Sequence, residues 1–150
     1  METIVVGVDG SGGSHAALEW AFAEAARRSA RVVALSVWQF PYLALGPSPI
    51  AGAVIPTDEL QATSEDALAQ ILADVGVPDG VEVTSIAKEG SASQALLEMA
   101  TTEAASLLVV GARGHGGFTG LLLGSVATQC VNHATVPTVV VPMHTSAATK

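Results

Sequence analysis

The chain has 150 residues, of which 49% are hydrophobic, enough for one substantial core, so we expect a single domain over residues 1–150. Its net charge of −8, from 6 Lys and Arg against 14 Asp and Glu, disfavours nucleic acid as a partner, because such a surface repels phosphates. No run of about 20 apolar residues suggests a membrane span, and the single cysteine rules out an internal disulfide, so we expect a cytoplasmic protein without membrane contact.

The start of the chain predicts two strands separated by a helix. The β-branched run Thr3–Val8 is apolar on both faces, as is typical of a central strand in a parallel sheet. A glycine-rich turn, Asp9–Gly13, ends this strand. Apolar residues at helical spacing then predict a helix over Ser14–Ala30, with Ser14 as its N-cap. The segment Arg31–Val37 predicts the second strand.

A segment rich in proline and glycine, Gln39–Pro56, separates the second strand from the next helix. We interpret it as a loop inside the domain, which could act as a lid, offer a surface to a partner or simply be disordered. The helix after it is expected to begin near Thr57 and to stop at Gly76, which would be a C′ glycine. The segment Val81–Ala87 predicts a third strand near an edge of the sheet, because polar residues interrupt its apolar pattern.

The rest of the chain repeats the alternation of helix and strand. Ser91 and Gln94 resemble a capping box that opens a third helix. A fourth strand is predicted over Ser106–Val110, a short fourth helix over Val126–Ala134 and a fifth strand over Thr138–Val141. This alternation predicts an α/β fold, a doubly wound, five-stranded parallel sheet with helices on both faces.

The strongest local motif follows the fourth strand. Gly111 and Gly114 are followed, nine residues later, by Gly124 and Ser125, in the pattern G-x2-G-x9-G-S. The first two glycines would let the backbone approach a phosphate, and the last two residues would offer N–H groups at a helix N-terminus. No Lys follows Gly124, so this is not a Walker loop. The motif predicts a triphosphate cradle, and the alternative is a surface loop whose glycines only serve turns.

Other polar residues lie near the predicted strand ends. Asp9, at the carboxyl end of the first strand, is positioned to accept from a ribose hydroxyl, or else forms an Asx turn at the helix entry. Arg113 and His115 lie in the glycine loop, where they could reach phosphates or be solvated. Cys130 is interpreted as a small core residue. The histidines have no metal-ligand spacing, and we expect neither a metal site nor a catalytic residue.

The glycine motif and the segment Gly7–Ser11 together resemble the ATP-binding branch of the universal stress protein family, and the similarity covers essentially the whole chain. The resemblance implies a sheet order of 3-2-1-4-5, in a fold of the adenine-nucleotide alpha-hydrolase type. It implies that Asp9 contacts the ribose of ATP and that a main-chain group near Val37 contacts the adenine. It also implies phosphate binding around Gly111, Gly114, Gly124, Ser125 and the following Val126. A triphosphate in this cradle is expected to bring Mg²⁺ with it.

The function expected from these features is a nucleotide-responsive regulatory module in a stress response, acting on an unknown protein partner. A slow ATPase or phosphotransferase using the same cradle is the alternative, although the loop has no Walker Lys and no evident carboxylate to orient a water. A dimeric scaffold whose nucleotide is incidental is the third hypothesis. The uncharged, β-branched run Thr138–Val141 predicts a homodimer through this edge strand, as the resemblance also implies.

Overall fold

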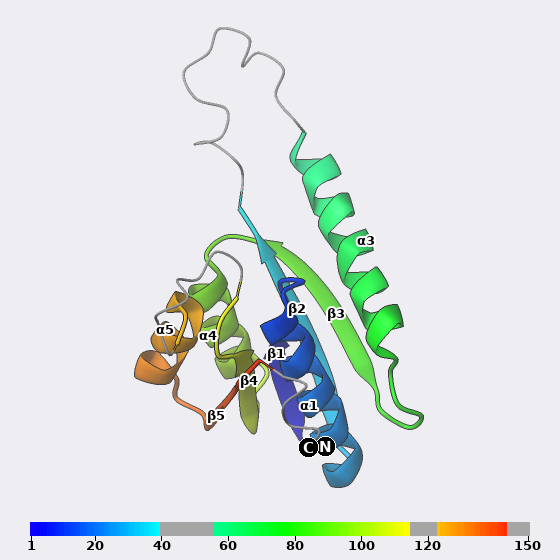
Figure 1. Ribbon diagram of the computed structural model, residues 1–150, viewed down its shortest axis with the longest axis vertical. Helices are drawn as coiled ribbons and strands as arrows, with labels where there is room; N and C mark the ends of the chain where they lie inside the picture. Colours follow the sequence, from blue (N-terminus) through cyan, green and yellow to red (C-terminus); the bar gives the residue numbers. More distant parts are fainter. Residues whose placement is uncertain (40–55, 115–122, 144–150) are drawn as a thin grey trace, which may run out of the picture.

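The computed structural model describes residues 1–39, 56–114 and 123–143 of the chain. Five parallel strands form one sheet in the order β3-β2-β1-β4-β5 (Figure 1). The strands are β1 Thr3–Gly7, β2 Arg31–Trp38, β3 Val83–Glu89, β4 Leu107–Gly111 and β5 Thr138–Val141. The helices are α1 Gly12–Arg28, α3 Thr57–Val75, α4 Ala92–Thr102 and α5 Ser125–His133. The predicted fold class and strand order are therefore confirmed.

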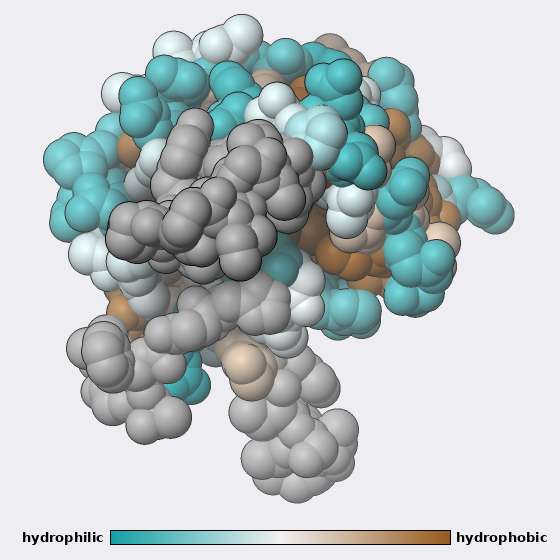
Figure 2. Space-filling model, turned by 90° about the horizontal axis from the view of Figure 1, so that it is seen from above, coloured by the Kyte–Doolittle hydropathy of each residue, from teal (hydrophilic) through white to brown (hydrophobic). Residues whose placement is uncertain are grey.

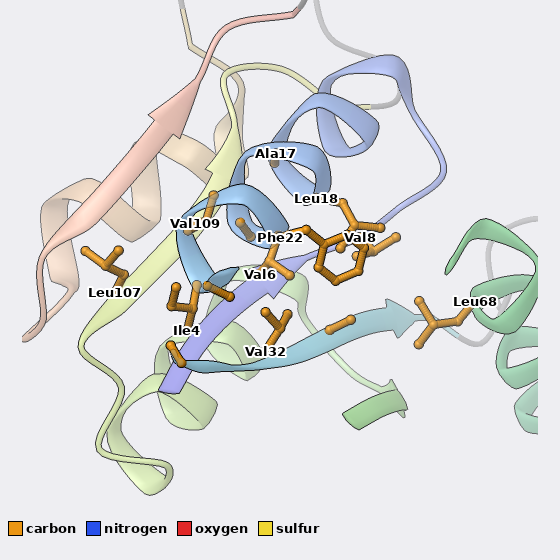
Figure 3. Close-up of a cluster of buried hydrophobic side chains, with 14 residues drawn as sticks. Ile4, Val6, Val8, Ala17, Leu18, Phe22, Val32, Leu68, Leu107 and Val109 are labelled. Carbon is orange, nitrogen blue, oxygen red and sulfur yellow. The ribbon is translucent and has the colours of Figure 1, made fainter. Parts of the chain in front are cut away.

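Helices cover both faces of this sheet because neighbouring residues of each buried strand point to opposite sides. Ile4 and Val6 of β1 point toward α1, where they join a buried cluster that reaches Leu68 of α3 (Figure 3). Val5 points the other way, into a second cluster beneath α4 and α5. Cys130 of α5 is fully buried in that second cluster, which confirms its interpretation as a core residue.

Two predicted helix starts were wrong in detail. Ser11, not Ser14, is the N-cap of α1, and its side chain accepts from the N–H of Ser14 at 3.2 Å. The two glycines between these serines suggested a turn, but they form the first residues of the helix. Ser91 does occupy the N-cap position of α4, yet its side chain makes no capping hydrogen bond, so the predicted capping box with Gln94 does not form.

The third strand was predicted two residues too early. β3 covers Val83–Glu89 and pairs with β2 from Val32, opposite Val83, to Trp38, opposite Glu89. This pairing extends the strand through Lys88 and Glu89, whose polar side chains gave no strand signal. The expectation that this strand lies at an edge is confirmed, and β5 forms the opposite edge.

An ion-pair network occupies the end of the sheet at which the strands begin. Arg27 and Arg28 both donate to the carboxylate of Glu24, and Arg28 also donates to Glu2 at 3.0 Å. These hydrogen bonds, from Arg27 first and then Arg28, hold the pKa of Glu24 below its ordinary value. The network ties the last turn of α1 to the start of the chain. None of the described helices combines the length and the hydropathy needed to cross a bilayer.

Most of the segment Gln39–Pro56, together with His115 and His144, lies outside the described residues. The predictions made for them are therefore left as predictions.

Candidate functional site

A pocket of about 260 Å³ opens at the carboxyl end of the sheet, between the ends of β1 and β4. The chain leaves β1 toward α1 on one face, while α5 lies on the other face, so the loops after these central strands diverge. Such a switch point is where open α/β sheets bind ligands. Figure 2 views the molecule from this end, where hydrophilic residues surround a recess in which hydrophobic residues are visible. The volume is near the lower end of the range for small-molecule pockets.

The structure brings all seven predicted binding residues together around this one pocket. They come from the ends of three strands and from the first turn of α5, and their binding roles remain predictions. The seven are Asp9, Val37, Gly111, Gly114, Gly124, Ser125 and Val126. Lining residues that the sequence interpretation did not select include Ser11 and Ser14 from the start of α1 and Leu96 from α4.

Asp9 forms the Asx turn that was the structural alternative to its ribose role. Its Oδ1 accepts from the backbone N–H of Ser11 at 2.9 Å and from the Ser11 hydroxyl at 2.5 Å. The Asp9 N–H in turn donates to the hydroxyl of Ser14 at 3.2 Å. The turn fixes the direction of the carboxylate at the mouth of the pocket, so the Asx turn and a ligand contact are compatible with each other.

The three motif glycines differ in how closely a side chain would approach its neighbours. A Cβ on Gly111 would lie 2.6 Å from the carbonyl carbon and oxygen of Gly13 in the first turn of α1. A Cβ on Gly13 would likewise overlap the carbonyl oxygen of Arg113. Gly111 therefore allows the end of β4 to pack against α1, in addition to the predicted role of letting the backbone approach a phosphate. Gly13 makes the same close packing possible from the α1 side, and the sequence pattern did not identify it as a site residue.

The other two glycines lie closer to the pocket itself. A Cβ on Gly114 would overlap Oδ2 of Asp9, so this glycine lets two loops from distant parts of the chain meet. A Cβ on Gly124 would come no closer than 3.4 Å to its neighbours, which is an ordinary contact distance, and its φ of −75° suits any residue. The conformation of Gly124 therefore does not explain why a glycine is present at this position.

The N-terminus of α5 presents main-chain donors to the pocket. Gly124 is the N-cap and has no side chain with which to cap the first N–H groups, while its own N–H donates to Ala112 O at 2.6 Å. The N–H groups in the first turn of a helix have no partners within the helix. Ser125, Val126 and Ala127 of this first turn all line the pocket. The helix dipole adds partial positive charge at the same point, so this wall of the pocket suits an anion.

The main chain of Val37 faces the pocket because β2 extends farther than β1. The last register pair of these strands joins Gly7 to Leu35, and the N–H of Val8 donates to Leu35 O at 2.9 Å. Alternate residues of a strand direct their main-chain groups to the same neighbour. The N–H and C=O of Val37 are therefore directed to the side that β1 no longer occupies. One main-chain donor and one main-chain acceptor thus lie at the edge of the pocket.

Charged groups are few among the described residues that line the pocket. Asp9 is the only carboxylate and Arg113 the only cationic side chain in that set. Within the described ranges, no group of three or more His, Cys, Asp or Glu side chains could hold a metal ion. Burial raises the pKa of Cys130 to about 11, so its thiol is protonated near neutral pH. Cys130 is not one of the residues that line the pocket.

A family model described as the universal stress protein family matches residues 1–142 of the chain. A universal stress protein of Mycolicibacterium smegmatis is 40% identical over 141 residues, which cover 92% of this chain and 45% of the relative. One from Mycobacterium tuberculosis is 39% identical over 145 residues, covering 91% of this chain and 43% of the relative. The chain thus spans a little under half the length of the curated relatives it matches.

Solved structures are similar over nearly the whole chain. The universal stress protein UspA from Lactobacillus plantarum superposes with a TM-score of 0.77 at 25% identity and covers 93% of this chain and 97% of its own. A universal stress protein solved in complex with cAMP has a TM-score of 0.65 at 25% identity, over 95% of this chain and 98% of its own. One from Archaeoglobus fulgidus, in complex with dAMP, has a TM-score of 0.65 at 20% identity, with coverages of 93% and 97%.

Proposed function

Because the chain belongs to the universal stress protein family, we propose that it is an adenine-nucleotide-binding module of this family and that its ligand is ATP. The observation that carries the proposal is that the ends of three strands, β1, β2 and β4, and the uncapped N-terminus of α5 converge on one pocket. The nucleotide complexes of two structural neighbours, with cAMP and with dAMP, support the adenine-nucleotide class.

In this proposal the adenine binds beside the end of β2. The N–H and C=O of Val37 pair with its polar edge, and the apolar side chains of Leu35, Leu96 and Val110 line the same pocket to cover its faces. Burying an aromatic ring against such side chains contributes about 25 cal/mol for each Å² removed from water. The carboxylate of Asp9, oriented by its Asx turn, then accepts from a ribose hydroxyl.

The phosphates bind at the glycine loop and the start of α5. The main-chain donors of Ser125 and Val126, the Ser125 hydroxyl and the main chain around Gly114 surround them. Hydrogen bonds of this kind to an anion are stronger than those between neutral groups. Local donors are needed here because the net charge of the whole chain, −8, repels a nucleotide at long range. A Mg²⁺ ion would then be carried in by the phosphates, without a protein cluster dedicated to it.

We favour a binding module over an ATPase. Asp9 is the only carboxylate among the described lining residues, and one of its oxygens is engaged by Ser11. Hydrolysis needs a group that orients the attacking water, and the ribose role already uses Asp9. The bound nucleotide would instead change what a protein partner contacts during a stress response. A cytoplasmic location suits this role and the single, buried cysteine.

The functional form would be a homodimer formed through β5. This strand has a neighbour on one side only, and its four residues, TVVV, are all partly exposed and uncharged. A second copy related by a two-fold axis could pair antiparallel with it and satisfy the main-chain groups of both edges. An unprotected edge of this kind otherwise favours aggregation.

The identity of the ligand is tested by denaturing freshly purified protein and analysing the released small molecules by mass spectrometry. The proposal predicts an adenine nucleotide close to one equivalent per chain, with ATP in the largest amount. Single-turnover measurements on the bound ATP then separate a binding module from a slow ATPase. Release of a different class of molecule, or rapid turnover to ADP, would contradict the corresponding part of the proposal.

A further inference from the structure

Gln61 of α3 links the ends of two strands near the pocket. Its Oε1 accepts from the indole N–H of Trp38 at 2.8 Å, and its Nε2 donates to the carbonyl oxygen of Ala87 at 2.7 Å and to Glu65 at 3.0 Å. Trp38 is the last residue of β2, and Ala87 lies on β3 at the edge of the sheet. The side-chain amide of Gln61 thus joins α3 to both β2 and β3.

The end of β2 depends on this link because it has lost one of its two neighbours. β1 pairs with β2 only as far as Leu35, whereas β3 continues beside it to Trp38. Strand ends held from one side open locally more readily than those held from both. The main chain of Val37 lies at the edge of β2 that β1 has left and that faces the pocket. The side chain of the next residue, Trp38, donates to Gln61 of α3. The position of Val37 therefore depends on the residue next to it.

From this geometry we propose that Gln61 is a positioning residue for the base of the bound nucleotide. It holds the indole of Trp38 and, through it, fixes the main-chain groups of Val37 at the edge of the pocket. The inference rests on the proposed adenine site. Gln61 does not line the pocket, so it acts without touching the ligand. The phosphate donors of α5 come from the other side of the sheet and do not depend on it.

If Gln61 positions the base, its removal should weaken the binding of ATP and not that of inorganic triphosphate. A general loss of stability would weaken the binding of both ligands. We expect Gln61→Ala to weaken ATP binding about five- to tenfold, in the range typical of coupling between sites, and to leave the binding of inorganic triphosphate unchanged. Gln61→Met fills a similar volume without the hydrogen bonds and should give the same result. Gln70→Ala is the matched control, because Gln70 lies on the same helix and donates to Asp74 of that helix, at 2.9 Å.

Titration calorimetry of the full chain with ATP and with inorganic triphosphate measures both affinities. A second readout is the fluorescence emission of Trp38 in a Trp20→Phe background. Addition of ATP should shift this emission when Gln61 is present, and much less when Gln61→Met is added to the same background. Wild-type ATP affinity in both Gln61 variants would overturn the inference and leave the proposed function intact. Equal losses for ATP and triphosphate, or a loss in Gln61→Ala but not in Gln61→Met, would also overturn it. Absence of ATP binding by the parent protein would overturn the proposed function and this inference together.

Discussion

Gly114 and Asp9 lie in loops that follow different strands, and the missing side chain of the glycine allows these loops to meet. A Cβ at position 114 would overlap Oδ2 of Asp9 and push the carboxylate away from the place fixed by its Asx turn. We therefore predict that Gly114→Ala weakens ATP binding about tenfold, or by about 1.4 kcal/mol, without unfolding the protein. Calorimetry gives the affinity, and circular dichroism reports on the fold.

Gly124→Ala is the matched control for this variant. Its Cβ would meet only ordinary contacts, the nearest at 3.4 Å, and its backbone angles suit alanine. The variant should fold like the parent protein and lose less affinity than Gly114→Ala. A Gly114→Ala protein that binds ATP as well as the parent would show that the position of Asp9 is not important for binding.

Asp9 itself can be tested with two substitutions that separate its two roles. Asp9→Asn keeps an oxygen that can accept from Ser11 and so preserves the turn, whereas Asp9→Ala removes the turn as well. If the carboxylate binds the ribose, both variants should weaken ATP binding, by about tenfold in Asp9→Asn, and leave inorganic triphosphate binding nearly unchanged. Parallel titrations with the two ligands make the comparison. Tighter triphosphate binding in both variants would instead place Asp9 beside the phosphates.

At the scale of helices and strands, the hydrophobic pattern predicted the sheet well and the polar contacts poorly. The apolar runs of β1, β4 and β5 identified strands because these residues are buried or lie against the core. Ser11 and Ser14 are both serines before the apolar residues of α1, and the helix begins at Gly12, so Ser11 is the cap. The end of β3 depends on pairing with Trp38, which a strand's own residues do not reveal.

In the candidate site too, the sequence pattern identified some residues, and contacts between distant parts of the chain could not be predicted from it. The motif glycines were recognisable because their spacing is unusual, and all of them line the pocket. The contact between Gly13 and Gly111 could not be predicted, because it joins the first turn of α1 to the end of β4. Gln61 was equally invisible, since a glutamine on an amphipathic helix has no pattern that distinguishes it from a solvated one.

The last turn of α1 predicts how stability changes in acid. Hydrogen bonds from Arg27 and Arg28 lower the pKa of Glu24, so the folded state favours the carboxylate more than the unfolded state does. Its contribution is complete above the ordinary pKa of 4.5 and is lost as the pH falls through the lowered, folded-state value. Urea unfolding should show Glu24→Gln less stable than the parent near pH 7, with a smaller difference at about pH 3. A difference that stays constant with pH would contradict this assignment.

At the scale of the whole molecule, the proposed dimer makes opposite predictions for neighbouring residues of β5. Pro137 O accepts from Leu108 at 2.9 Å and Val141 O accepts from Ala112 at 2.8 Å, so odd-numbered residues of this strand face β4. The N–H of Val140 therefore faces outward, and the N–H of Val141 faces β4. Val140→Pro should dissociate the dimer and keep the fold, whereas Val141→Pro should lower the melting temperature by several degrees.

Light scattering after size exclusion measures the state of the parent protein and of both variants. The parent should be a dimer, and Val140→Pro a folded monomer. A parent protein that stays monomeric at high micromolar concentration, with and without ATP, would rule out β5 as a dimer interface under those conditions.

The central claim is that the pocket at the carboxyl end of the sheet binds ATP through the main chain at the start of α5. Titration calorimetry of nucleotide-free protein with ATP tests it most directly, using Ser125→Pro and Ser125→Ala beside the parent. Proline is accepted at the first helical position, so Ser125→Pro keeps the helix but removes a main-chain donor, whereas Ser125→Ala removes only the hydroxyl. We predict one saturable site per chain in the parent, binding about tenfold weaker in Ser125→Pro and a smaller loss in Ser125→Ala. No saturable binding by the parent, or equal affinity in the parent and Ser125→Pro, would contradict the account.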